Sequence, residues 1–137
     1  MNRRLSREEG IKLLYQMSIN KCSVEEALGD FGENYEEDLE QIDLTYMKRI
    51  ISGVYDNMAE LDGKIEKHLV NWKMSRISKI NLAILRACTY EIVYDTETPA
   101  AVFINEAVEI AKKYSEDKSV GFINGVLDRI AKKEGRI

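Results

Sequence analysis

The sequence is poor in cysteine, histidine and proline, and each shortage excludes a class of site. Its 137 residues include two cysteines, one histidine and one proline. Cys22 and Cys88 have no C-x-x-C partner, so the sequence predicts neither a zinc site nor a disulfide framework. We expect Cys88, which lies in an apolar stretch, to be a small buried hydrophobic residue. His68 has no second histidine or cysteine at ligand spacing, so we expect it to be exposed or half-buried.

Long apolar runs and phosphate-binding loops are absent as well. The sequence contains no run of about 18 apolar residues, the length that a membrane-spanning helix needs, and its N-terminus lacks the apolar region of a signal peptide. We therefore expect a cytoplasmic protein with no membrane segment. There is no glycine-rich phosphate loop, and Asp30-Phe31-Gly32 stands without the other motifs of a kinase. We predict no catalytic residue, no metal and no cofactor, so an enzyme acting on RNA is the least favoured interpretation.

What the sequence does contain is a helical pattern of apolar residues. It is 45% hydrophobic and 32% charged, the composition of a globular chain with a real core. Apolar residues recur at spacings of three and four, as in Leu44, Met47 and Ile50, whereas strand-type alternation is scarce. We therefore predict an all-α fold, a single compact domain over residues 1–137 with about seven helices.

Local signals predict where several helices begin. Ser6 with Glu9, and Ser23 with Glu26, have the spacing of a capping box, in which a serine hydroxyl and a glutamate satisfy two backbone N–H groups. We expect one helix to follow each of these pairs. A long helix should begin near Asp43.

Other signals predict where helices stop. The second helix should end near Gly29, and the acidic residues 31–41 should form a loop. Residues 62–63, an Asp-Gly pair, should interrupt the helical pattern. Residues 80–93 are the most apolar run and should form the central helix. Pro99 suits the first turn of the next helix, where its missing N–H is not needed.

Two residues stand out inside the apolar stretches. Arg86 lies among apolar neighbours, where an unpaired guanidinium would cost several kcal/mol on burial. We predict that it forms a structural ion pair with Glu106 on a neighbouring helix and so fixes the helix register. Gly125 lies in the middle of the last helix, and we predict that it allows a close approach of another helix.

Charge is unevenly distributed along the chain. The formal net charge is −4, yet the first seven residues hold Arg3, Arg4 and Arg7 and no acid. Residues 30–43 hold acids and no base, whereas residues 112–136 hold more bases than acids. This distribution suits a local contact with a polyanion and is equally typical of a solvated surface, so charge alone leaves both interpretations open.

A series of short segments, taken in order, forms a more specific pattern. They are the arginine-rich start, Leu14-Tyr15, Leu61-Asp62-Gly63, Ala83-Ile84-Leu85-Arg86, Tyr90-Glu91, Pro99, the run from Ile104 to Lys112, and the run from Phe122 to Asp128. In this order and spacing the chain resembles the NusB family of bacterial transcription antitermination factors over nearly its whole length. A related domain begins some ribosomal RNA cytosine methyltransferases. Because the chain ends at Ile137, we expect the stand-alone factor.

The resemblance implies an all-helical fold and a role in RNA binding. NusB-like proteins pair with NusE, a ribosomal protein, and the pair recognises single-stranded boxA RNA on nascent transcripts. The complex that forms there keeps RNA polymerase from terminating early, notably on ribosomal RNA operons. The family's RNA face combines the arginine-rich start with the segment leading into the last helix. The matching positions are Arg3, Arg4, Arg7, Tyr15, Lys118, Ser119 and Phe122.

These residue types suit the implied chemistry. Arginines can bind phosphates through paired hydrogen bonds and can stack on bases, and aromatic rings stack on unpaired bases. The spacing of Tyr15 and Phe122 is equally typical of core residues, so the role of these two side chains stays open.

Two positions depart from the family pattern. Lys118 stands where better-known relatives carry an acid, which should favour RNA binding by the factor alone. Asn81 replaces an acid near the partner-binding face, which should reduce the ionic part of the NusE contact. The alternative interpretation is a helical protein–protein interaction module, such as a homodimer that masks its RNA face.

Overall fold

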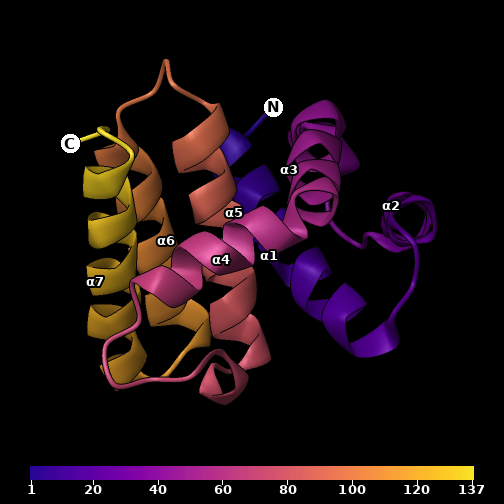
Figure 1. The fold of residues 1–137 in the computed structure, drawn as a ribbon. Coiled ribbons are helices and arrows are strands. Elements are labelled where there is room, and N and C mark those ends of the chain that lie inside the picture. Colours follow the sequence, from indigo (N-terminus) through magenta and orange to yellow (C-terminus); the bar gives the residue numbers. More distant parts are fainter.

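The protein is all-α, as the apolar spacing predicts. The computed structural model describes residues 1–137 and contains seven α-helices and two short 3₁₀ helices in one domain (Figure 1). The α-helices are α1 (Arg3–Asn20), α2 (Val24–Asn34), α3 (Leu44–Asp56), α4 (Met58–Lys67), α5 (Lys79–Tyr94), α6 (Ala100–Tyr114) and α7 (Asp117–Lys133). The 3₁₀ helices are η1 (Leu39–Gln41) and η2 (Met74–Arg76). None of the helices combines the length and the apolar character needed to cross a membrane.

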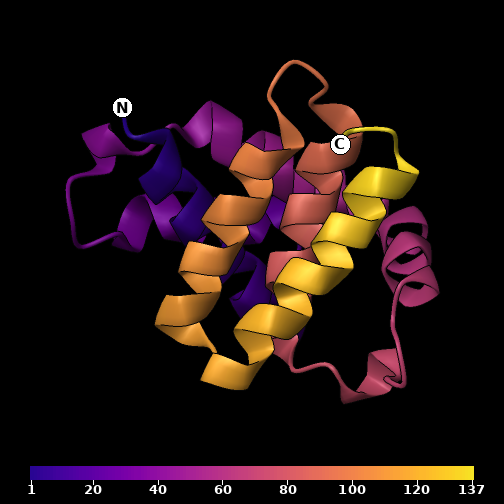
Figure 2. The same ribbon diagram turned by 90° about the vertical axis from the view of Figure 1, so that its left-hand side faces the viewer.

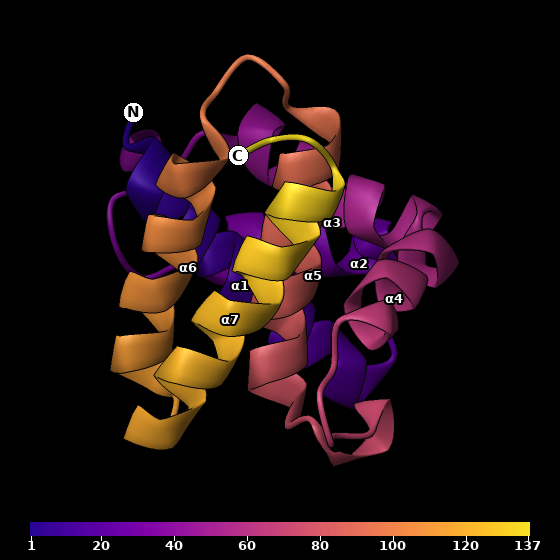
Figure 3. The same ribbon diagram turned by 60° about the vertical axis from the view of Figure 1, so that its left-hand side comes forward.

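Helix α5 is the centre of the bundle. It packs against α1, α3, α4, α6 and α7, and most of its apolar side chains, Cys88 included, are buried. Helices α6 and α7 lie side by side along it (Figure 2), whereas α2 lies at the edge against α1 and α3 with only Ala27 buried. Both termini lie toward the same end of the bundle (Figure 3). The turn before α7 therefore lies at the opposite end from the start of α1.

Helix α1 begins earlier than the capping-box pattern predicts. Asn2 is the N-cap, and its side chain accepts a hydrogen bond from the backbone N–H of Leu5. Ser6 lies inside the helix and is fully buried; its hydroxyl donates to the Asn2 carbonyl and accepts from the backbone N–H of Asp43, both at 2.8 Å. The predicted cap at Ser6 is therefore wrong, because this hydroxyl joins α1 to the start of α3. As a result Arg3 and Arg4 belong to an ordered first turn.

The other predicted boundaries are partly right. The capping box of Ser23 and Glu26 is confirmed, and Asp43 caps α3 as predicted. Helix α2 continues past Gly29 to Asn34, so the predicted acidic loop is shorter and includes η1. Residues 62–63 lie within α4, and the break falls earlier, at Asn57.

The predicted ion pair between Arg86 and Glu106 is also wrong. Arg86 lies on the side of α5 that faces α4, and its Nε and Nη2 atoms donate to the two carboxylate oxygens of Asp62, each at 2.8 Å. Glu106 lies on α6 and accepts from Arg4 Nε at 3.0 Å. Arg86 thus joins α5 to α4, and this pairing explains why an aspartate is favourable at a position inside α4.

The close helix approach occurs at a different glycine from the one predicted. A Cβ at Gly125 would meet only the Arg129 side chain of the same helix, at 3.2 Å. A Cβ at Gly53 on α3 would overlap the ring of Tyr90 on α5. Gly53 therefore sets how closely α3 and α5 pack.

Candidate nucleic-acid interface

Arg3 and Arg4 project from the first turn of α1 and remain accessible. The Arg4 side chain is 77% exposed although its Nε donates to Glu106. The Arg3 guanidinium lies 4.4 Å from the centre of the Tyr46 ring, a cation–π distance. Two of the three predicted arginines therefore present charge at one end of the bundle.

Arg7, the third predicted arginine, does not present its charge to solvent. Its side chain is 8% exposed, and Nε and Nη2 donate to the Glu91 carboxylate at 2.8 and 3.1 Å. Burial by itself would lower the pKa of Arg7, but the hydrogen bonds and the negative charge of Glu91 outweigh it and raise the pKa. The expectation that Arg7 contacts RNA is corrected: Arg7 lies on the inward face of α1, and the Glu91 carboxylate balances its charge.

Tyr46 completes this buried cluster. Its hydroxyl donates to Glu91 at 2.6 Å, and burial together with the Glu91 charge raises the pKa of Tyr46. The phenol therefore stays protonated and keeps its hydrogen bond. The cluster fixes the rotation of α1, and with it the direction in which Arg3 and Arg4 point.

Tyr15 is half-buried and packs against the core. It follows Arg4 and Glu8 at helical spacing on the side of α1 that faces α6, because Arg4 contacts Glu106 and Glu8 contacts Tyr114. Tyr15 therefore lies along the surface that connects the start of α1 with the end of α6. The structure leaves its RNA contact a prediction.

Glu8, an acid on this surface, is neutralised by a neighbouring lysine. Glu8 accepts from Lys113 Nζ at 2.8 Å and from the Tyr114 hydroxyl at 2.5 Å. Burial of Glu8 would raise its pKa, but these two hydrogen bonds outweigh the burial and lower the pKa. Burial and the contact with Glu8 raise the pKa of Tyr114 to about 12. The surface between α1 and α6 thus presents an ion pair here rather than an isolated carboxylate.

Lys118 and Phe122 line a groove at the far end of the bundle. The groove has a volume of about 740 Å³ and lies between the connector from α4 to α5 and the start of α7. Lys118 is 85% exposed and lies 3.4 Å from Glu116. Phe122 is half-buried, and its ring centre lies 5.9 Å from that of Trp72 with the two planes tilted by 57°. Trp72 is 49% exposed, so one of the two rings is open to solvent.

Ser119 is held in this groove by Asn81. The amide nitrogen of Asn81 donates to the Ser119 hydroxyl oxygen at 3.1 Å, and the amide oxygen accepts from Ser115. Asn81 is 8% exposed, so the amide forms part of the groove floor. Because the Ser119 hydroxyl accepts from Asn81, its own proton is free to be donated outward.

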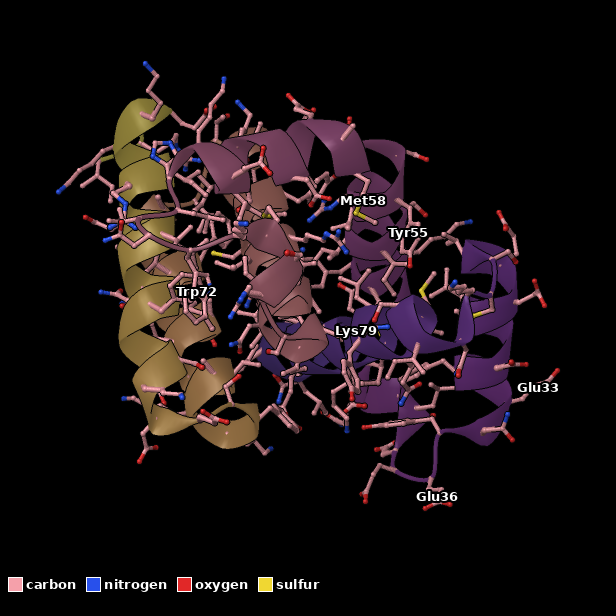
Figure 4. All side chains as sticks on the ribbon, turned by 60° about the horizontal axis from the view of Figure 1, so that its bottom comes forward. Glu33, Glu36, Tyr55, Met58, Trp72 and Lys79 are labelled. Carbon is pink, nitrogen blue, oxygen red and sulfur yellow. The ribbon has the colours of Figure 1, made fainter.

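The structure therefore brings Lys118, Ser119 and Phe122 together in one groove, whereas Arg3 and Arg4 lie outside it, at the start of α1. It also adds two side chains that the sequence analysis does not single out, Trp72 and Arg76 of the connector. The signal in the sequence that could have identified Trp72 is an isolated tryptophan in a polar segment. In Figure 4 Trp72 lies beside α7, whereas the acidic residues Glu33 and Glu36 lie on the α2 side of the molecule.

Comparisons with known proteins agree over nearly the whole chain. The NusB family model matches residues 4–132. The transcription antitermination protein NusB of Clostridium botulinum (strain Alaska E43 / Type E3) is 56% identical over 97% of this chain and 100% of its own length. The protein of the same name from Clostridium novyi (strain NT) is 48% identical over 96% of this chain and 99% of its own.

Solved structures show the same fold. T. maritima NusB superposes with a TM-score of 0.83 at 32% identity and covers 97% of this chain and 92% of its own. A crystal structure of the antitermination factors NusB and NusE in complex with double-stranded RNA gives a TM-score of 0.83 at 23% identity, with 96% of each chain covered.

The fold and these relatives define the class: an all-helical, non-enzymatic RNA-binding protein of the transcription machinery. Within that class the chain belongs to the NusB family, and its function is transcription antitermination.

Proposed function

We propose that the protein acts in the cytoplasm with NusE, a small-subunit ribosomal protein, to bind single-stranded boxA RNA on nascent transcripts. Bound there, notably on ribosomal RNA operons, it joins the RNA polymerase antitermination complex and helps the polymerase to avoid premature termination. Family membership supports this role, and a protein of the same fold has been crystallised with NusE and RNA.

One observation carries the proposal: the half-exposed Trp72 ring, packed against the half-buried Phe122, lies beside the exposed cation of Lys118. Unpaired bases expose faces that stack on aromatic rings, whereas bases in a duplex are already stacked on each other. The groove therefore favours a single strand, with a base on Trp72 and its phosphate near Lys118. Arg76 lies on the same rim and supplies a second cation.

The strand then runs from the groove toward the start of α1. Tyr15 and Tyr114 lie along this route, and Arg3 and Arg4 bind phosphates at its end. Guanidinium groups suit this role because their planar array of N–H donors matches the phosphate oxygens. Ser119 can donate its hydroxyl proton to a base edge or a phosphate oxygen.

Two residues adjust the balance between RNA and partner. Lys118, in place of an acid, removes a repulsion from the groove and so strengthens binding by the factor alone. Asn81, also in place of an acid, forms neutral hydrogen bonds with Ser115 and Ser119 and offers NusE no ion pair at that position.

The test is the affinity for boxA RNA and for a scrambled oligomer of the same composition, with and without NusE, measured by fluorescence anisotropy. We expect the factor to prefer boxA and NusE to increase that preference. Equal affinities for the two oligomers in the presence of NusE would overturn the proposal. Light scattering during the same titration tests the alternative, because a dimer that dissociates as RNA is added would show that its RNA face is masked in the free protein.

A further inference from the structure

A second hollow, of about 470 Å³, lies at the end of the bundle where α1 begins. It is lined by Arg3 of α1, Arg49 of α3, the end of α5 and the loop from α5 to α6. Neither the predicted RNA contacts nor the groove beside α7 includes Arg49. The hollow is contiguous with the proposed RNA surface because Arg3 belongs to both.

One buried ring positions both guanidinium groups. Arg3 lies 4.4 Å and Arg49 lies 5.4 Å from the centre of the Tyr46 ring. The ring cannot move easily, because Tyr46 is 2% exposed and its hydroxyl donates to Glu91. Two like charges are thus held beside the same ring.

Neither charge is matched by a carboxylate of the protein. Arg4, Arg7 and Arg86 each have a carboxylate within hydrogen-bonding distance, whereas Arg3 and Arg49 have no ion pair. A phosphate between two adjacent guanidinium groups would relieve their repulsion and accept hydrogen bonds from both.

The acids of the hollow determine where such a phosphate can lie. Glu91 is taken up by Arg7, and Asp95 accepts from the backbone of Glu97 and Thr98 within its own turn. Glu97 is exposed and has no cationic partner, so it repels an anion on the loop side. The favourable position is therefore on the α3 side, between Arg3 and Arg49.

We propose that the RNA strand does not end at the start of α1 but continues across α3, where Arg3 and Arg49 hold one further phosphate between them. This inference rests on the proposed function. It makes Arg49 an RNA-contacting residue and makes Glu97 a residue that opposes binding at the same place.

The experiment compares a core boxA oligomer with oligomers extended by four nucleotides at the 5′ or the 3′ end, by fluorescence anisotropy over a series of salt concentrations. The variants are Arg49→Ala, Glu97→Gln and, as a matched control, Lys48→Ala. Lys48 is the exposed neighbour of Arg49 on α3 and carries the same charge, but it does not line the hollow.

We expect Arg49→Ala to weaken binding of one extended oligomer about three- to tenfold, and to reduce its salt slope by about 0.7, the value for one phosphate contact on a single strand. Glu97→Gln should strengthen binding of the same oligomer. Lys48→Ala should change neither the affinity nor the salt slope for any oligomer. None of the variants should change binding of the core oligomer. Inorganic phosphate added at a fixed ionic strength should leave the difference between Arg49→Ala and the parent protein unchanged, because the site binds a phosphate of the strand.

Equal effects of Arg49→Ala and Lys48→Ala, or an equal loss of affinity for the core oligomer, would overturn the inference while leaving the proposed function intact. If inorganic phosphate at low millimolar concentration abolishes the difference between Arg49→Ala and the parent protein, the pair binds free phosphate and the continued strand is ruled out. A parent protein that does not distinguish core boxA from its scrambled form would instead refute the proposed function itself.

Discussion

Arg7 of α1 and Glu91 of α5 form a buried two-point ion pair, with donor–acceptor distances of 2.8 and 3.1 Å. The Tyr46 hydroxyl donates to the same carboxylate and ties α3 into the cluster. Arg7 thus comes from a basic run typical of an exposed segment, yet it is buried and paired inside the core. Its role is to fix α1 so that its neighbours Arg3 and Arg4 face outward.

Arg7→Met should destabilise the fold by about 3–5 kcal/mol, because it leaves the Glu91 carboxylate buried without its partner. Urea unfolding followed by circular dichroism measures the loss. The double variant Arg7→Met/Glu91→Gln should recover much of it, since a neutral amide can still accept from Tyr46. If Arg7→Met keeps full stability and loses RNA affinity instead, Arg7 contacts RNA after all.

Gly53 and Gly63 should respond to alanine with opposite signs. Gly53→Ala forces a methyl group into the Tyr90 ring and should cost about 1–3 kcal/mol, the range for overpacking. A Cβ at Gly63 meets nothing within 4 Å inside α4, so Gly63→Ala should stabilise by about 0.4–1 kcal/mol. Thermal unfolding of the two variants provides the comparison, and a stabilising Gly53→Ala would contradict the described packing of α3 on α5.

Glu8 should make stability depend on pH in the acidic range. Its pKa is lowered in the folded protein, so its contribution is fully present above the unfolded-state pKa and is lost as pH falls through the folded-state value. Unfolding free energies of the parent and of Glu8→Gln, measured from neutral to acidic pH, should therefore converge as the pH falls. A constant gap between the two curves would show that Glu8 does not titrate as described.

The arginines and the aromatic pair should affect RNA binding in different ways. Arg3→Ala/Arg4→Ala should weaken binding to all sequences and reduce the salt slope by about 1.4, because two phosphate contacts are removed. Phe122→Ala should reduce the preference for boxA and leave the salt slope unchanged, since stacking carries no charge. A mobility-shift series over salt concentration tests both. An unchanged slope in the double arginine variant would exclude phosphate contact there.

The fold was predictable because its signals are local. Apolar residues at helical spacing gave the central helix, and the caps at Ser23 and Asp43 depend only on nearby backbone. The errors at Ser6 and Arg86 have another origin. Ser6 bonds Asp43, the N-cap of α3, and Arg86 bonds Asp62 in α4, so each partner lies far away in the sequence. A local pattern does not determine which helices become neighbours.

The site was predictable only where a resemblance supplied it. The grouping of Lys118 with Phe122 came with the family pattern, whereas Trp72 joins them only because the connector folds back beside α7. The expectation that Arg7 contacts RNA is wrong because three arginines close together in the sequence suggest one common surface. On the helix, Arg4 and Arg7 point in different directions, one toward solvent and one toward the core.

Trp72 is the single tryptophan of the chain, and its fluorescence tests the central claim most directly. Because its half-exposed ring faces the groove, a base stacked on it should quench the emission. We predict that saturating boxA RNA quenches Trp72 strongly, and that Phe122→Ala or a scrambled oligomer reduces the quenching. Unchanged emission while anisotropy reports full binding would contradict the account, because the strand would then lie away from the groove.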